Sequence, residues 1–332
     1  MRPACSSAEL VPERQGGACR AEMIRLIGRR LLYMLATMFV ASLLLFLLFE
    51  LSPSDVAVSA LGPYSTTEQR QLWLTENGYD RPAYIRYAEW LGHFAVGDWR
   101  MSRIYGAPVA GVVWQHLANT AILGFWVFVF LIPLSLVLGV LSGAREGSAL
   151  DRIISTLLVV TASVPPFAST VLVSAIFVFG LSWLPGTSSM IDGFDWRELV
   201  MPVMVLVIYD LGYVARITRI SMAEVMTTPY MRTAQLKGLP RYRVIWRHAL
   251  RNALITPITV LLLHINWLIA GVIVVEFYFA YKGFGSLILA AALGRDLVVL
   301  EACTMVTVAI AVATQTIADV VYTFLNPRIR FK

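Results

Sequence analysis

The sequence is poor in charged residues and contains long stretches without any. Asp, Glu, Lys and Arg make up only 14% of its 332 residues, whereas soluble domains carry about 25%. This scarcity excludes a soluble globular domain. A helix needs roughly 20 apolar residues to cross a bilayer. Uncharged stretches near or above that length occupy 31–49, 104–144, 153–191, 252–275 and 302–318. We therefore predict an all-α polytopic membrane protein.

Cysteine and histidine are also rare, which excludes several kinds of site. The three cysteines, Cys5, Cys19 and Cys303, lack the spacing of a disulfide framework or a zinc site. The four histidines are scattered, and no two of them have the spacing of metal ligands. We therefore expect this chain to bind no metal or cofactor.

Lysine occurs only at Lys237, Lys282 and Lys332, where it follows Leu, Tyr and Phe. A P-loop requires Gly-Lys followed by Ser or Thr, so this nucleotide-binding motif is absent. The spans also lack a nucleophile with a base at helical spacing, as an intramembrane enzyme would require. We predict that the chain is not an enzyme and has no ATPase site of its own.

Hydropathy predicts about six membrane spans. We place them at roughly 30–50, 114–141, 153–180, 200–222, 253–275 and 299–324. An even number of spans puts both termini on one side. If the termini are cytoplasmic, the inner segments hold 19 of the 27 arginines and lysines and the outer segments hold 8. Because cytoplasmic loops carry the excess of positive charge, this orientation is favoured.

The chain divides into a short tail and one membrane domain. Residues 1–24 begin with small and polar residues that lack an apolar period, so we predict a disordered tail. Residues 25–332 form the membrane domain. The net charge of +6 indicates contact with anionic lipid rather than with nucleic acid, because the cations gather beside the spans.

The outer segment, 51–110, reads as two short amphipathic helices. Ser65 and Glu68 have the spacing of a capping box, and Gly78 is suited to end the first helix. Pro82 starts the second, which carries Tyr84, Tyr87, Trp90 and Leu91. These aromatic residues are expected to rest at the membrane surface or to line a docking face.

The inner loop, 223–251, is strongly basic. Residues 232–251 contain six arginines or lysines and no acidic residue. Thr228 and Pro229 form a helix start, Gly238 is suited to end that helix, and Pro240 begins another. Such charges most often fix topology and touch anionic lipid, which a flexible linker would do equally well. The caps and the glycine turn favour a rigid element that transmits force.

Several motifs, in order, resemble the permeases of ABC importers, specifically the B-type transmembrane subunit of the dipeptide/oligopeptide permease family. The stretch EVMTTPYMRTAQLKGLPRYRVIWRHALRNALITPITV resembles the EAA loop of that family. The family's first span is similar to RRLLYMLATMFVASLLLFLLFELSPSD, and its extracytoplasmic segment is similar to NGYDRPAYIRYAEWLGHFAVGDWRMS. Three further stretches also resemble the family: SGAREGSALDRIIS, VVEFYFAYKGFGSLI and the ending DVVYTFLNPRIR. The resemblance covers nearly all of the chain after residue 24.

The resemblance implies a fold, partners and a location. The fold is the type I ABC importer transmembrane domain in the bacterial cytoplasmic (inner) membrane. The partners are a second homologous permease forming a heterodimer, two cytoplasmic ABC ATPases that bind ATP and Mg, and an extracytoplasmic substrate-binding protein. Loop 223–251 would couple the chain to the ATPases, through Glu224, Tyr230, Arg232, Thr233, Ala234, Lys237, Gly238, Leu239 and Pro240.

Four polar residues in or near the spans are candidates for the transport pathway or its gate. They are Asp210, His264, Asn266 and Glu276. Ionisable groups inside a membrane commonly face a cavity, but each of the first three also fits a structural hydrogen bond or interhelical pair. Glu276 resembles a family position at the outer mouth. Separately, Gly139 and Gly143 have the small-xxx-small spacing of close helix packing.

The substrate is the least determined property. Family precedent favours di- or oligopeptides, while relatives with this architecture also import nickel chelates, glutathione and oligosaccharides. A stand-alone secondary transporter would usually show two repeated halves with broken helices, and the sequence has no convincing internal repeat. A channel fits the composition as well, but neither alternative requires ATPase partners.

Overall fold

A computed structural model describes residues 14–50, 53–190 and 193–325. Within these ranges the regular structure is helical, apart from an isolated β-bridge between Met101 and Pro108. The first helices are α1 (Arg14–Glu50), α2 (Pro53–Leu61), α3 (Thr67–Glu76), α4 (Ala83–Ala95), α5 (Val109–Gly143), α6 (Ala149–Ser163), α7 (Pro166–Ser174) and the π-helix η1 (Ala175–Gly180). Next come α8 (Trp196–Met226), α9 (Pro229–Leu236), α10 (Arg241–Val244), the π-helix η2 (Ile245–Ala249) and α11 (Leu250–Ala253). The last are α12 (Ile255–Gly271), α13 (Ile273–Tyr278), α14 (Phe284–Leu293) and α15 (Leu297–Leu325).

The described helices provide four to six membrane spans. Segments of α1, α5, α8 and α15 are each long and apolar enough to cross a bilayer. Two bent pairs bring the number to six if each is one span: α6 with Pro166–Gly180, bent by 99°, and Arg241–Ala253 with Ile255–Ile265, bent by 47°. The upper number agrees with the six predicted spans.

The third predicted span, 153–180, is broken rather than continuous. The break follows Ser163, where Val164 is extended and Pro165 precedes α7. A residue before proline is sterically pushed out of the α conformation, and proline cannot donate the helical hydrogen bond. The Val164-Pro165-Pro166 sequence therefore causes the break.

Helices α5 and α8 form the closely packed centre of the fold. Gly139 and Gly143 of α5 lie directly against α8. A Cβ atom on Gly139 would lie 2.6 Å from the carbonyl oxygen of Ala215, and one on Gly143 would lie 2.5 Å from that of Arg219. The small-xxx-small prediction is therefore confirmed, because only glycine allows the two backbones to come this close.

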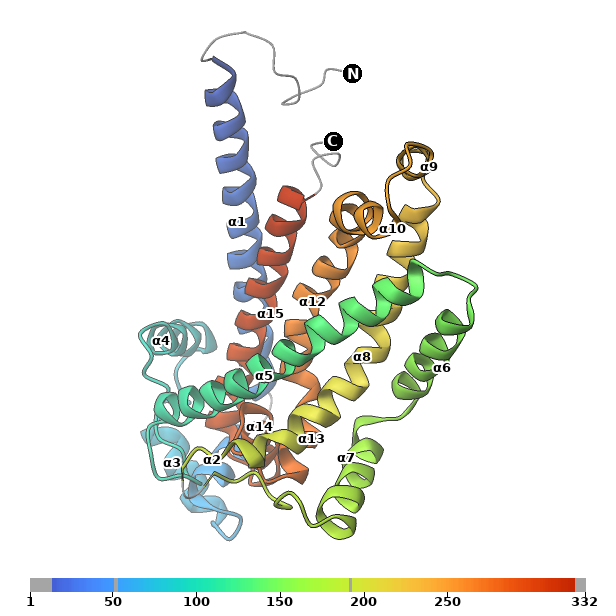
Figure 1. Cartoon of the computed structure of the whole chain (residues 1–332). Coiled ribbons are helices and arrows are strands. Elements are labelled where there is room, and N and C mark those ends of the chain that lie inside the picture. The colour runs from blue at the N-terminus through green and yellow to red at the C-terminus, as the bar shows by residue number, and fades with distance from the viewer. Residues whose placement is uncertain (1–13, 51–52, 191–192, 326–332) are drawn as a thin grey trace.

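The segments predicted to share a membrane side lie at the same end of the molecule. Helices α9 and α10 lie at one end, near the turn between α5 and α6, while α2, α3 and α14 lie at the opposite end (Figure 1). Helix α1 lies beside α15, and Arg30 forms an ion pair with Asp319 there. We call these the loop end and the outer-helix end.

The tail differs from its prediction. Helix α1 begins at Arg14, so residues 14–24 are helical where the composition predicts disorder. A helix already formed by an apolar span extends at low cost into preceding residues such as Ala21 and Glu22, because propagation is easier than nucleation. Residues 1–13 lie outside the described residues.

Candidate coupling loop and polar cavity

The basic loop folds as a helix, a glycine turn and a second helix, as predicted. Helix α9 has Pro229 at its first position and is followed by Lys237 and Gly238. Gly238 has φ +74°, in the left-handed region that favours glycine. Pro240 then precedes α10. The turn therefore directs the chain back toward the spans within a few residues.

One face of α9 packs against the membrane domain. Met231 and Ala234 are buried there in an apolar cluster with Met222 of α8 and Val244 of α10. Ala234, one of the predicted coupling residues, is only 7% exposed and contacts its own chain, so its side chain does not face a partner. Leu239 is also partly buried against this cluster.

The opposite face of the loop is exposed. Leu236 keeps 81% of its surface accessible, and a Cβ atom on Gly238 would contact nothing within 4 Å. Tyr230 is 42% exposed and receives a hydrogen bond from the side chain of Asn252 at 3.0 Å. The other predicted coupling residues on the exposed surface are Glu224, Arg232, Thr233, Lys237 and Pro240.

Two hydrogen bonds hold the loop and the helices that flank it. Arg241 donates from Nη2 to the carbonyl oxygen of Ala144 at 2.8 Å, which satisfies a carbonyl at the end of α5. Ser221 of α8 donates to the carbonyl oxygen of Ala253 at 2.8 Å. Together with the apolar cluster, these bonds hold the loop as one packed unit with the spans.

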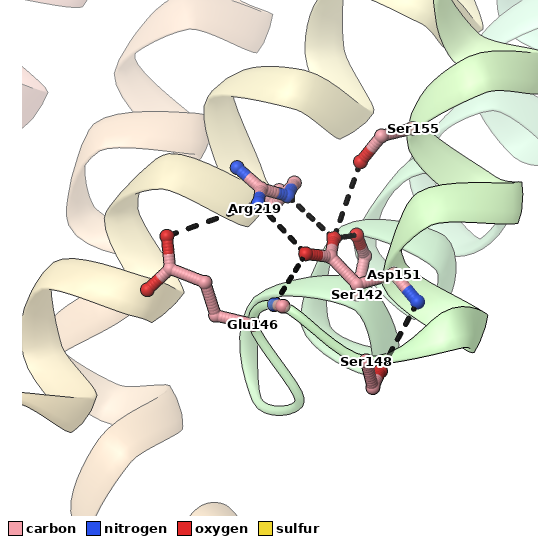
Figure 2. A network of polar contacts seen from close by, with 7 residues as sticks. Ser142, Glu146, Ser148, Asp151, Ser155 and Arg219 are labelled. Carbon is pink, nitrogen blue, oxygen red and sulfur yellow. Dashed lines mark hydrogen bonds and ion pairs between the residues drawn. The ribbon is translucent and has the colours of Figure 1, made fainter.

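An ion pair between a buried carboxylate and a partly exposed guanidinium lies beside this unit. Figure 2 shows Asp151 of α6 facing Arg219 of α8, whose Nε and Nη2 donate to its two carboxylate oxygens at 2.6 and 2.8 Å. Ser142 of α5 donates to the same carboxylate. Sequence reasoning missed this contact, because 68 residues separate the two charges and no local pattern links them.

Asp210 and His264, both candidate pathway residues, lie together. Asp210 of α8 is 2% exposed, and its Oδ1 lies 3.5 Å from Nε2 of His264 in α12. The ring of Tyr213 stacks on His264 at a centroid distance of 5.2 Å. These three residues, with Tyr209 and Arg216, line a cavity of about 390 Å³. Ionisable side chains thus line a cavity between spans, which is typical of a transport pathway.

Asn266 belongs to α12, but its side chain lies outside the described residues. The prediction that it lines the pathway therefore stays a prediction.

Glu276, the candidate gate, is fully buried and acts as a cap. Its carboxylate accepts hydrogen bonds from Thr120 Oγ1 at 2.6 Å and from the backbone N–H of Ser286 at 2.9 Å. The second bond satisfies a donor in the first turn of α14. Glu276 lies outside the candidate spans, and its burial raises its pKa to about 7. A residue enclosed in this way does not face a pathway.

Gly283 makes this cap possible. A Cβ atom on Gly283 would lie 2.0 Å from Oε1 of Glu276, so a side chain and the carboxylate exclude each other. The backbone N–H of Phe284 donates to Thr120 Oγ1 at 2.7 Å. Within the Lys282-Gly283-Phe284-Gly285 motif, Gly283 is therefore needed for the turn into α14.

The outer segment, 51–110, forms three helices rather than the two predicted, because α2 precedes α3 and α4, which are the predicted pair. The capping residues of α3 also differ from the prediction by one position. Thr66 and Gln69, rather than Ser65 and Glu68, form the reciprocal capping box of α3. Gly78 has φ +75° and follows the end of α3 as predicted. Ser65 and Thr66 can each cap the start of this helix, and sequence spacing alone does not show which of two adjacent residues is the cap.

The aromatic residues of α4 fix the outer segment to the spans. Tyr87 lies 5.3 Å from Phe46 of α1, measured between ring centroids. Further along, Phe94 stacks on Trp99 at 5.0 Å, and Trp99 lies 6.4 Å from Trp114 of α5. These rings pack within the chain, while Tyr84 stays 73% exposed. The packed rings give the outer surface a rigid base.

Family models account for almost the whole chain. Residues 135–331 match the binding-protein-dependent transport system inner membrane component. Residues 23–132 match the N-terminal region of such membrane components. The chain belongs to this family, and its helical architecture fits the transmembrane fold of type I ABC importers. It is therefore a multi-pass inner-membrane protein and a translocation subunit.

Curated relatives match over nearly their full lengths. A putative peptide transport system permease protein of Brucella abortus is 33% identical over 93% of this chain and 100% of the relative. The oligopeptide transport system permease protein AppB of Bacillus subtilis is 30% identical, with the same coverage. The glutathione transport system permease protein GsiC of Escherichia coli is 29% identical over 93% of this chain and 100% of its own.

Proposed function

We propose that this chain is the membrane-spanning subunit of an ATP-driven, binding-protein-dependent importer of di- or oligopeptides. The observation that carries the mechanism is the exposed face of α9 and the Gly238 turn, set on a packed base. The names of the relatives favour peptides, and one of them makes glutathione the alternative substrate. The lack of a P-loop in the sequence supports assigning ATP hydrolysis to other subunits.

The proposed complex contains four kinds of subunit. Two cytoplasmic ATPases carry ATP and Mg, and one of them docks on the exposed face of α9. A second, related permease completes a heterodimer, and an extracytoplasmic protein delivers the substrate to the outer-helix end. Both termini are then cytoplasmic, in accord with the excess of arginine and lysine on that side.

The mechanism follows from the rigidity of the loop. Closure of the two ATPases on nucleotide displaces α9, and the spans rock between inward-open and outward-open states. A disordered loop would absorb this displacement, whereas α9 is packed against the spans through Ala234 and the following α10 is bonded to Ala144 through Arg241. The cavity beside Asp210 is the polar space that the substrate crosses.

Replacing Gly238 by Asp tests the coupling role. The side chain would project from an exposed turn and strain its left-handed backbone, so we expect loss of ATP-dependent peptide uptake with normal membrane insertion. Gly97→Asp is the matched control, because Gly97 also has φ of +83° and open surroundings but lies on the outer segment. Normal uptake by the Gly238 variant would refute the assignment of this loop.

A further inference from the structure

One carboxylate lies at a junction of three helices beside the coupling loop. Asp151, 3% exposed, accepts hydrogen bonds from α5 and α8 through Ser142 and Arg219 (Figure 2). It also accepts from the backbone N–H of Gly147 at 2.9 Å and from Ser155 Oγ at 3.2 Å. Every donor points at the same two oxygens, so the position of the carboxylate is fixed by all three elements.

The charged contact differs in kind from the apolar packing around it. A bidentate guanidinium–carboxylate pair sets both distance and orientation, whereas apolar surfaces such as those at Gly139 and Gly143 contact without a preferred direction. Arg219 lies in the part of α8 that leads directly to α9. A displacement of α9 therefore reaches α8 through the chain and α5 through the close backbone packing at Gly139 and Gly143. The Asp151–Arg219 pair links α6 to α8 with a defined direction.

The coupling loop and the break in the third span complete the mechanical unit. Arg241 holds the loop to Ala144, two residues beyond Ser142. Helix α6 ends at Ser163 and is separated from α7 by a bend of 99°. The extended backbone at Val164 interrupts the helix between α6 and α7.

We propose that Asp151 and Arg219, with Ser142, form a brace that makes the loop end of α5, α6 and α8 move as one body with the coupling loop. The brace consists of positioning residues, and it rests on the proposed function. It sets the fraction of the ATP-driven displacement that reaches the spans. Its loss uncouples ATP hydrolysis from uptake without removing ATPase docking.

The test uses the assembled transporter in proteoliposomes and measures peptide taken up per ATP hydrolysed. Asp151→Asn keeps the side-chain shape but removes the charge and one acceptor. We expect uptake per ATP to fall about tenfold, with the amount of ATPase bound unchanged. Glu146→Gln is the matched control, because Glu146 lies 3.8 Å from Arg219 and is exposed. We expect that variant to retain the wild-type ratio.

A spectroscopic measurement separates the brace from a merely structural role. Spin labels at Ile153 of α6 and Tyr242 of α10, which are 62% and 63% exposed, are placed in a chain without its native cysteines. The distance between labels should be the same in the nucleotide-free and ATP-trapped complexes. In the Asp151→Asn complex it should change between these states.

The outcomes decide the proposal in either direction. The brace would be overturned if Asp151→Asn kept the wild-type uptake per ATP. It would also be overturned if the distance between the labels changed with nucleotide in the complex that has the native Asp151. If Asp151→Asn does not assemble, Arg219→Lys replaces it, since lysine keeps the charge but loses the bidentate geometry. A wild-type ratio in Arg219→Lys would then overturn the brace. Wild-type complexes without ATP-dependent uptake would instead refute the proposed function.

Discussion

Replacing Gly283 by Ala should destabilise the outer-helix end by a specific clash. The backbone at Gly283 has φ −100° and ψ 178°, which alanine adopts without strain. The added Cβ would nevertheless lie 2.0 Å from Oε1 of Glu276, so the carboxylate must leave Thr120 and Ser286. Each buried polar group left without its partner costs about 1–3 kcal/mol. We therefore expect the free energy of unfolding to fall by about 2–6 kcal/mol for the two bonds.

The assay is thermal unfolding of the purified chain in detergent, read as a double-mutant cycle with Glu276→Ala. If the clash is with the carboxylate, the effect of Gly283→Ala should largely vanish in the Glu276→Ala background, a non-additivity of about 2 kcal/mol or more. Gly111→Ala is the control, because Gly111 lies in α5 with nothing within 4 Å. Equal effects of Gly283→Ala in both backgrounds would refute the reasoning.

Three further predictions concern other buried contacts. The pKa of Glu276 is raised from 4.5 to about 7, so the folded chain binds this proton more tightly. The contribution of Glu276 to stability is therefore full below pH 4.5, and about 3 kcal/mol of it is lost as the pH rises from 4.5 through 7. Glu276→Gln should flatten this fall in pH-dependent melting, and an equal slope would contradict the assignment. Gly139→Leu should separate α5 from α8 and reduce the monodisperse fraction in gel filtration, whereas Gly111→Leu should not. Asp210→Asn should raise the KM for peptide about tenfold and leave the melting temperature unchanged. If the melting temperature falls and the KM does not change, the contact between Asp210 and His264 has a structural role instead.

Most of the fold could be predicted from apolar length and from special backbone residues. Uncharged runs locate the spans because a bilayer requires about 20 apolar residues per helix. The turn at Gly238 was predictable, because a helix often ends at a residue in the left-handed conformation and glycine adopts that conformation without strain. The break at Pro165 was also visible in the sequence, since consecutive prolines end a helix, but hydropathy alone treats 153–180 as continuous.

The site was less predictable, because burial and long-range partners decide it. Ala234 reads as a small exposed residue, and only the packing of α9 shows that it faces its own chain. Glu276 resembles a gate residue in sequence, yet its carboxylate is hydrogen-bonded to Thr120, 156 residues earlier, and to the backbone N–H of Ser286. The Asp151–Arg219 pair joins charges from separate helices, and such pairing depends on a fold that composition does not determine.

The central claim is that ATP hydrolysis by partner subunits drives substrate through this chain. The most direct test is uptake of labelled dipeptide by proteoliposomes that contain the chain with its second permease, the ATPases and the binding protein. We predict uptake that requires ATP and the binding protein and that is lost in the Gly238→Asp variant. Uptake by the chain alone, driven by an ion gradient and indifferent to ATP, would contradict the account.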